Sequence, residues 1–308
     1  MELRFGLFLL VALIPVIFAQ DISHGSIVVD GTMTVAQTDD NFVCATIDWW
    51  PHDKCNYGQC PWHYTSVTNL NLSHPFLAKA VQGVDPKLIS KILNPDHLNK
   101  ASYTFGNLTH VIQRHGPWSS AWVGESGGAS NSGGAHVSNT FVNSFCALLW
   151  HRLMGKVVLS VESDASPFLR SYAHCSKGRA GVTLLVINLS NQTNFVMNVQ
   201  NSINLKLAVN EQNISQGSFT HTLKKTFSWV GTKASDEALF REEYHLTPKD
   251  DYLQSQTMVL NGIPLEFTDA GNIPSLDPFH VNLKSPISIS PLSIAFIVFP
   301  NFEAPACG

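Results

Sequence analysis

The chain has 308 residues, of which 44% are hydrophobic and 14% charged, and its formal net charge is −4. This apolar composition can build a sizeable core and excludes a disordered chain, while the weak negative charge offers no basic surface for nucleic acid. The length suggests about two domains, although a complete (β/α)8 barrel of about 250 residues would leave too little chain for a second one.

The N-terminus is typical of a secretory signal peptide. Arg4 precedes an apolar run at 5–18 that ends at Ala19, and this run is shorter than the roughly 20 residues that span a bilayer. A membrane anchor is the alternative interpretation. We expect removal of residues 1–19 and secretion to the extracellular space or cell wall, with a lysosomal or vacuolar location and peripheral membrane association as alternatives. No later segment is long and apolar enough to span a membrane.

Sequons and cysteines also fit an oxidising secretory compartment. The sequon asparagines, none followed by proline, are Asn71, Asn107, Asn188, Asn191 and Asn213. The six cysteines are Cys44, Cys55, Cys60, Cys146, Cys175 and Cys307. Disulfides are favoured, although a zinc site formed by Cys55 and Cys60 with His52 or His63 is the alternative. Because no second Cys or His pair lies at ligand spacing, we expect no metal and no other cofactor.

Two regions follow one another along the chain. The first is mixed: we expect strands at 26–37, 42–48 and 121–123, helical turns within 75–115 and a helix at 137–154 capped by Gly155. The second has only strand-like runs, at 157–161, 182–189, 195–209, 219–229, 258–260, 280–283 and 294–299. Short strands at such spacing predict an antiparallel sandwich.

Glu125 is the leading candidate for a catalytic carboxylate. It follows the apolar strand 121–123 and Gly124, and small residues at 126–129 come directly after it. A carboxylate at the end of a barrel strand points to the face where such enzymes do chemistry, and small neighbours let a substrate approach. An ordinary acidic loop residue is the alternative interpretation. Trp49 and Trp50, at the end of an earlier strand, are candidates for a sugar-binding groove.

Other polar residues are weaker candidates. We interpret Glu242 and Glu243 as a solvated face of the second region, and the pair Asn210-Glu211 as a solvated loop. His115 and His136 are candidate neighbours of Glu125.

Residues 122–129 (Trp-Val-Gly-Glu-Ser-Gly-Gly-Ala), 131–133 and 137–141 resemble the nucleophile region of plant heparanase-like proteins, a family that contains retaining endo-β-glucuronidases. Residues 43–50 resemble the first barrel strand of that family, and residues 147–155 resemble its last barrel helix. Residues 170–176 and 182–190 resemble the start of its β-sandwich. The resemblance covers nearly all of the chain after the leader.

The resemblance implies an α/β plus all-β fold, in which an incomplete (β/α)8 barrel stands beside a C-terminal antiparallel β-sandwich. The expected divisions are a signal peptide at 1–19, a strand joining the sandwich at 20–37, a partial catalytic domain at 38–155 and the sandwich at 156–308. A disulfide between Cys175 and Cys307 is implied as well.

The resemblance also implies site roles. Glu125 corresponds to the nucleophile, and Asp48 corresponds to a substrate-contacting aspartate. The backbone amides that receive the sugar carboxylate correspond to Asn131, Ser132 and Gly133. Ser130 replaces the tyrosine usual in the family. The implied partner is a glucuronic-acid-containing polysaccharide or proteoglycan.

One part of the family's machinery is missing. Retaining glycosidases need a second carboxylate about 5–5.5 Å from the nucleophile, and in this family that acid/base glutamate follows the fourth barrel strand. The chain passes from Gln82 almost directly to Asp85-Pro86, in a helix that belongs late in the barrel, and a second gap falls at 145–147. We therefore expect a heparanase-like hydrolase that is weak or inactive. The alternatives are a non-catalytic glycan-binding protein and a non-functional shortened product.

Overall fold

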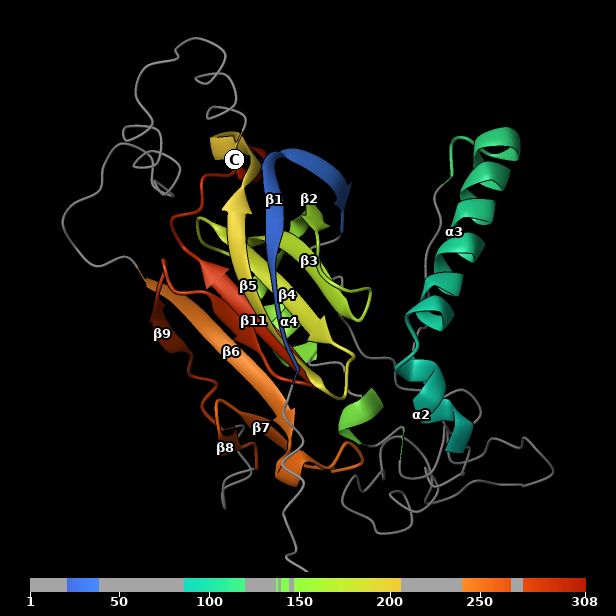
Figure 1. Ribbon diagram of the computed structural model, residues 1–308. Coiled ribbons are helices and arrows are strands. Elements are labelled where there is room, and N and C mark those ends of the chain that lie inside the picture. Colours follow the sequence, from blue (N-terminus) through green and yellow to red (C-terminus); the bar gives the residue numbers. More distant parts are fainter. Residues whose placement is uncertain are drawn as a thin grey trace, which may run out of the picture.

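The structure is a computed structural model that describes residues 21–38, 86–119, 137, 140–143, 147–205, 240–266 and 274–308 (Figure 1). Its strands are β1 (Asp21–Gln37), β2 (Met154–Ser163), β3 (Leu169–Ser176), β4 (Val182–Asn188), β5 (Thr193–Asn201), β6 (Phe240–Pro248), β7 (Met258–Leu260), β8 (Ile263–Pro264), β9 (Phe279–Asn282), β10 (Ile287–Ile289) and β11 (Ser293–Phe299). Its helices are α2 (Pro86–Ile92), α3 (Pro95–His115) and α4 (Ala147–Leu153), with 3-10 turns η4 (Phe141–Asn143), η5 (Lys249–Asp251) and η6 (Pro305–Cys307).

The strands form one sheet in the order β10-β5-β1-β2-β3-β4-β11-β6-β7-β8, and β9 pairs with β6. β1 lies parallel to β5, from Asp21 opposite Thr193 to Val29 opposite Asn201, and antiparallel to β2. The N-terminal strand is therefore built into the sheet formed by the C-terminal half of the chain. None of the helices in the described part of the chain is long and apolar enough to cross a bilayer.

The sheet curls, so that strands from one end of the strand order and strands from its centre share one apolar core. Ile27 of β1, Met197 of β5 and Ile289 of β10 are fully buried in one cluster with Leu184 of β4 and Ile297 of β11. Strands at the start of the order therefore pack over strands from its centre, which encloses this cluster between two layers.

The opposite face of β4 and β11 is also buried. Leu185 and Phe296 alternate with residues of the first core and belong to a second cluster, which Leu149 and Leu153 of α4 and Phe141 of η4 cover. Burial on both faces explains why these strands are almost uniformly apolar in sequence.

Two predicted elements are wrong in their limits. The single helix expected at 137–154 is broken, because Val137 lies in a turn, η4 follows, and Met154 already belongs to β2, opposite Ser176 of β3. Gly155 is a strand residue and no helix cap. A Cβ there would lie 2.7 Å from the carbonyl oxygen of Cys175, so glycine allows the close approach of β2 to β3.

The strand expected at 195–209 ends at Asn201, and residues 202–205 are helical. The Oδ1 atom of Asn201 accepts a hydrogen bond from the Ile203 amide at 3.1 Å, an Asx turn that redirects the backbone. The strand expected at 219–229 lies outside the described residues.

α3 extends away from the sheet (Figure 1) and is held at its first turn. The guanidinium of Arg170 on β3 donates to the Pro95 carbonyl at 2.9 Å and to Asn99 Oδ1 at 2.6 Å. Farther along the helix, Tyr103, Phe105 and Val111 are 72%, 48% and 55% exposed. Leu98 and Leu108 are exposed as well, whereas Ile112 is half-buried, so most of the described apolar side chains of this helix lie at the surface.

Candidate functional site

The residues assigned to catalysis and substrate binding lie outside the described part of the chain. They are Glu125, Asp48, Asn131, Ser132 and Gly133. The same holds for Trp49, Trp50, His136, Asn210, Glu211, Asn71, Asn213, Cys44, Cys55, Cys60 and Cys146. Their roles stay predictions, and the structure describes the elements that flank the Glu125 segment.

The segment that carries Glu125 runs between α3 and η4. On its N-terminal side, α3 ends where the Gly116 amide donates to the Ile112 carbonyl at 2.8 Å, and the neighbouring His115 is exposed. On its C-terminal side, the Phe141 amide donates to the Ser255 carbonyl and the Val142 amide to the Leu253 carbonyl, both at 2.9 Å. η4, which follows in sequence, is thus fixed to the loop that joins β6 to β7.

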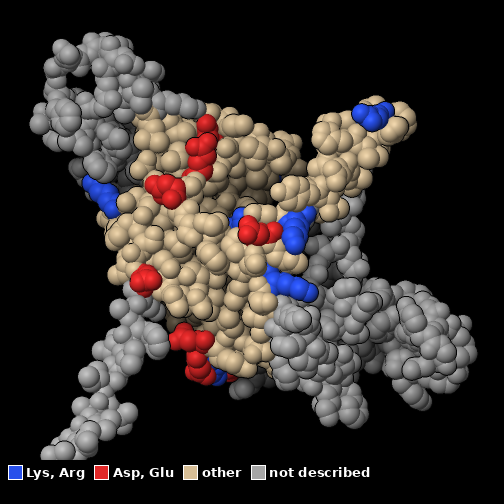
Figure 2. All heavy atoms as spheres, turned by 45° about the vertical axis from the view of Figure 1, so that its right-hand side comes forward, with Lys and Arg blue, Asp and Glu red and all other residues tan. Residues whose placement is uncertain are grey.

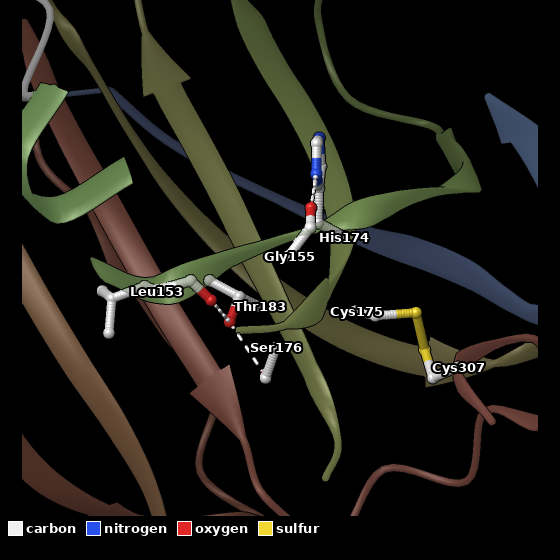
Figure 3. The surroundings of a disulfide bond; sticks show 7 residues. All are labelled: Leu153, Gly155, His174, Cys175, Ser176, Thr183 and Cys307. Carbon is white, nitrogen blue, oxygen red and sulfur yellow. Dashed lines mark hydrogen bonds between the residues drawn. A yellow bond between two sulfur atoms is a disulfide. The ribbon is translucent and has the colours of Figure 1, made fainter. Parts of the chain in front are cut away.

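α4 is fixed to the sheet by its last turn. The Leu153 carbonyl accepts hydrogen bonds from the Thr183 hydroxyl at 3.0 Å and from the Lys177 amide at 2.9 Å, and the Ser176 hydroxyl donates to Thr183 Oγ1 (Figure 3). Carbonyls at a helix end need such partners. Arg152 donates to the Leu276 carbonyl at 3.2 Å from the same turn.

His174 of β3 lies buried beneath this junction. Its Nδ1 donates to the Gly155 carbonyl at 2.7 Å (Figure 3), and its ring meets Trp150 of α4 edge-on, with centroids 5.3 Å apart. Burial lowers the pKa of His174, and the hydrogen bond to Gly155 opposes this shift in part. The neutral imidazole is therefore the form that the fold favours.

Next to His174, Cys175 forms a disulfide with Cys307, the pair that the family resemblance implies (Figure 3). The bridge joins β3 to η6 across 132 residues of sequence. It closes the C-terminal end of the chain onto the first core, which Cys307 and Ala306 line.

The interpretation of Glu242 and Glu243 as a solvated face is wrong. Glu243 is 6% exposed and Arg241 is 1% exposed. One oxygen of Glu243 accepts from Arg241 Nε at 2.6 Å, and the other lies 2.7 Å from His245 Nε2. Burial raises the pKa of Glu243, but the hydrogen bond to His245 and the charge of Arg241 outweigh it and lower that pKa overall.

Arg241 also holds the segment between β9 and β10. Its guanidinium donates to four backbone carbonyls there, at distances of 2.6 to 3.2 Å: Asn282, Leu283, Ser285 and Pro286. These partners lie about forty residues away in sequence, so the pattern of β6 alone could not reveal them. The arrangement is structural, because a charge buried in this way is tolerated only with full pairing.

Glu242 points to the other face of β6. Its carboxylate forms a two-pronged ion pair with Arg179, at 2.8 and 2.7 Å, and accepts from the Tyr244 hydroxyl at 3.1 Å. Arg179 lowers the pKa of Glu242, whereas burial and Glu242 raise the pKa of Tyr244 to about 12. Both glutamates are thus engaged in ion pairs and do not form a pair of facing carboxylates.

Two cavities of the described region are each lined by a charged group that the fold already pairs. One of about 430 Å³ is lined by Asn201, Arg241 and Lys284, and another of about 300 Å³ by Glu243, His245 and serine hydroxyls. No group of three His, Cys, Asp or Glu side chains suited to a metal occurs within the described residues. Figure 2 shows acidic and basic residues mixed over the drawn face, without an extended patch of one sign among the described residues.

Comparison with known proteins places these elements in a family context. The profile of the glycosyl hydrolase family 79 N-terminal domain matches residues 24–86 and 82–150. Heparanase-like protein 1 of Arabidopsis thaliana is 33% identical over 521 positions, covering 94% of this chain and 96% of the relative. Heparanase-like protein 2 of the same plant is 31% identical, covering 97% and 98%. Baicalin-beta-D-glucuronidase of Scutellaria baicalensis is 29% identical, covering 71% and 44%.

These alignments contain long internal gaps in this chain. The alignment with heparanase-like protein 1 has 521 positions and the chain has 308 residues, so at least 213 positions (521 minus 308) stand opposite a gap. The family profile matches twice, and its two matches meet at residues 82–86. The chain therefore reaches both ends of its relative while carrying much less sequence between them.

Proposed function

The chain belongs to glycosyl hydrolase family 79, the family of the heparanase-like proteins, and from this we propose that it derives from a retaining β-glucuronidase and is itself weak or inactive as a catalyst. The family prediction made from residues 122–141 is thereby confirmed.

The observation that carries this proposal is the position of the gap. The two profile matches meet at 82–86, where Gln82 leads almost directly into a helix that belongs late in the barrel. The acid/base glutamate of the family follows the fourth barrel strand, which falls within the sequence skipped there. A chain that keeps Glu125 but skips this strand retains one of two required carboxylates.

The exposure of α3 supports the same proposal. A barrel helix packs its apolar side against the strands inside it. In α3, Phe105 and Val111 are about half exposed, and Leu108 is 40% exposed. Within the described residues, this exposure is what the proposal expects of a helix whose neighbouring strands are skipped.

We propose the corresponding architecture: an incomplete (β/α)8 barrel at 38–155 and an antiparallel β-sandwich at 156–308 that takes in the strand at 20–37. The curled sheet around two apolar clusters supports the sandwich. In this arrangement α4, which packs on the sheet, is the last barrel helix.

In the complete enzyme, Glu125 would attack the anomeric carbon of a glucuronide and form a glycosyl-enzyme ester as the leaving sugar departs. The second glutamate would first donate a proton to that leaving oxygen and then remove one from the attacking water. Without it, leaving-group departure loses its proton donor, and such catalysis typically contributes about 10²–10⁴-fold.

The substrate class in this proposal is a glucuronic-acid-containing polysaccharide or proteoglycan outside the cell, with Asp48 and residues 131–133 as its contacts. The name of one relative, a glucuronidase, supports a glucuronide. No cofactor takes part in this chemistry. Secretion, with a lysosomal or vacuolar location as the alternative, completes the proposal.

A nitrophenyl β-glucuronide assay on the purified chain tests the proposal. We expect no turnover above that of the Glu125→Gln variant, with thermal unfolding recorded to establish that both are folded. Glu162→Gln, a change at an exposed position of β2, is the matched control. Turnover that Glu125→Gln abolishes and Glu162→Gln preserves would overturn the proposal.

A non-catalytic glycan-binding role is the second candidate, because the sheet and its two cores are intact without the missing barrel strands. Retention of the folded chain on an acidic-polysaccharide column without hydrolysis would favour it. Poor secretion and protease sensitivity would instead favour a non-functional product, since uncovered barrel elements expose apolar side chains and strand edges.

A further inference from the structure

Two sequons follow each other without a gap where β4 turns into β5, at 188–190 and at 191–193. We propose that Asn191 is the glycosylated residue of this turn and that Asn188 stays unmodified, because the fold uses the whole side-chain amide of Asn188. This inference concerns a modification site and does not depend on the proposed catalytic activity.

Asn188 is a buried connector between three segments. It is 2% exposed, and its Nδ2 donates to the carbonyls of Thr193 at 2.8 Å, Ile289 at 3.2 Å and Ser290 at 2.9 Å. Its Oδ1 accepts from the Ser190 amide at 2.9 Å. The amide orientation follows from chemistry, since an oxygen in the place of Nδ2 would face three carbonyl oxygens.

N-glycosylation would destroy this arrangement. In that reaction the amide Nδ2 attacks C1 of the N-acetylglucosamine of a lipid-pyrophosphate-linked oligosaccharide. The C1–O bond to the pyrophosphate breaks, the lipid pyrophosphate leaves, and Nδ2 gives up one proton. The remaining N–H cannot serve the three carbonyls, and a sugar cannot fit at a buried nitrogen, so a chain modified at Asn188 cannot complete this end of the sheet.

Asn191 lies in the opposite situation. It is exposed at the tip of the turn, and Gln192 beside it is exposed as well. The turn is held by its neighbour instead: the Ser190 hydroxyl oxygen accepts from the Gln192 amide at 3.3 Å and from the Thr193 amide at 3.0 Å. A glycan on Asn191 therefore extends into solvent without disturbing a hydrogen bond of the turn.

Glycopeptide mapping of the full chain, expressed behind a secretion leader in a eukaryotic host, tests the proposal. Enzymatic deglycosylation in ¹⁸O-water converts each glycosylated Asn into labelled Asp. In the soluble secreted fraction we expect the label at Asn191 and unmodified Asn188. Label at Asn188, or no label at Asn191, in this fraction would overturn the proposal.

Two variants separate the sequons. Asn191→Gln should remove one glycan from the secreted protein and leave its melting temperature nearly unchanged. Ser190→Asn destroys only the sequon of Asn188 and keeps a side-chain oxygen that can accept from the turn amides. It should leave the glycan mass unchanged, and loss of one glycan in this variant would contradict the assignment. If either variant is retained in the cell, glycopeptide mapping of the chain without substitutions still decides which asparagine carries the glycan.

Discussion

His174 joins the last helix of the mixed region to the sheet in its neutral form. Its Nδ1–H is held by the Gly155 carbonyl and its ring lies against Trp150, so protonation would place a charge in a buried apolar junction. The lowered pKa of His174 expresses the cost of that charge.

Stability should therefore fall in mildly acidic solution. An unfolded histidine takes up its proton as the pH drops through about 6.5, whereas folded His174 resists until a lower pH. The stability that the neutral ring contributes is present above pH 6.5 and is lost as the pH falls from there toward the folded pKa. Urea unfolding at pH 7.5 and pH 5 should show a smaller difference for His174→Gln than for the unchanged chain. His97→Gln, at an exposed position of α3, should leave the difference unaltered.

The buried ion pair between Glu243 and Arg241 should contribute to the free energy of unfolding. Replacing Glu243 with Gln removes the charge that balances Arg241, which stays buried and bound to the backbone between β9 and β10. Breaking a buried pair from one side costs about 3–5 kcal/mol. We expect Glu243→Gln to lower the free energy of unfolding by about 3 kcal/mol in urea titrations. Glu162→Gln should change it by less than about 0.5 kcal/mol, as is usual at the surface, and equal effects would contradict the structural role of the pair.

At the scale of elements, the connection from β3 to β4 depends on glycine. Gly181 has a φ of +94°, and a Cβ there would lie 2.1 Å from the Phe299 carbonyl oxygen at the end of β11. Gly178, in the same connection, has a φ of +70°, and a Cβ added there would meet no atom within 4 Å. Both positions carry backbone strain for an alanine, but only Gly181 adds a steric collision. Substitutions at the two positions therefore separate the two effects.

Gly181→Ala should therefore destabilise the sheet much more than Gly178→Ala. The left-handed backbone alone costs an alanine about 1–2 kcal/mol, which we expect for Gly178→Ala. The collision with β11 adds to this at Gly181, for a total of about 3 kcal/mol or more. Thermal unfolding of the two variants side by side measures the difference, and equal losses would show that β11 simply moves aside.

The strands that can be predicted from the sequence are those whose pattern is local. β4 and β11 stand out as apolar runs because both of their faces are buried. In β1, more buried and less buried residues alternate at 27–31, as expected of a strand with one buried face. The break between α4 and β2 could not be predicted, because it depends on the contact of Gly155 with β3. The charged stretch Arg241–Glu243 looks solvated in sequence, since its partners come from a distant segment. The candidate site was predicted through a family motif, and its roles stay predictions because its residues lie outside the described part of the chain.

At the scale of the whole molecule, the disulfide Cys175–Cys307 closes the C-terminal half into one unit. It links residues 132 positions apart, and a bridge across so long a loop constrains the unfolded chain strongly. The double variant Cys175→Ser, Cys307→Ser should lose about 2–5 kcal/mol of unfolding free energy. Reducing agent should destabilise the unchanged chain and have much less effect on the variant. If reducing agent destabilised the unchanged chain and the double variant equally, the disulfide Cys175–Cys307 would not be the source of the redox sensitivity.

The internal gap leads to the last prediction, which concerns the origin of the chain. The exposed apolar side chains of α3 and a family profile interrupted at 82–86 both fit a polypeptide whose middle has been skipped. We expect the gene to encode further sequence between Gln82 and Val84 and around Cys146, at least 213 codons in total if it follows heparanase-like protein 1 (521 minus 308). Sequencing of transcripts amplified across both positions should reveal the longer form, with amplification across 156–205 as a control of constant length. A gene with no coding sequence between these codons would contradict skipping. The short chain would then be the full product that the gene encodes.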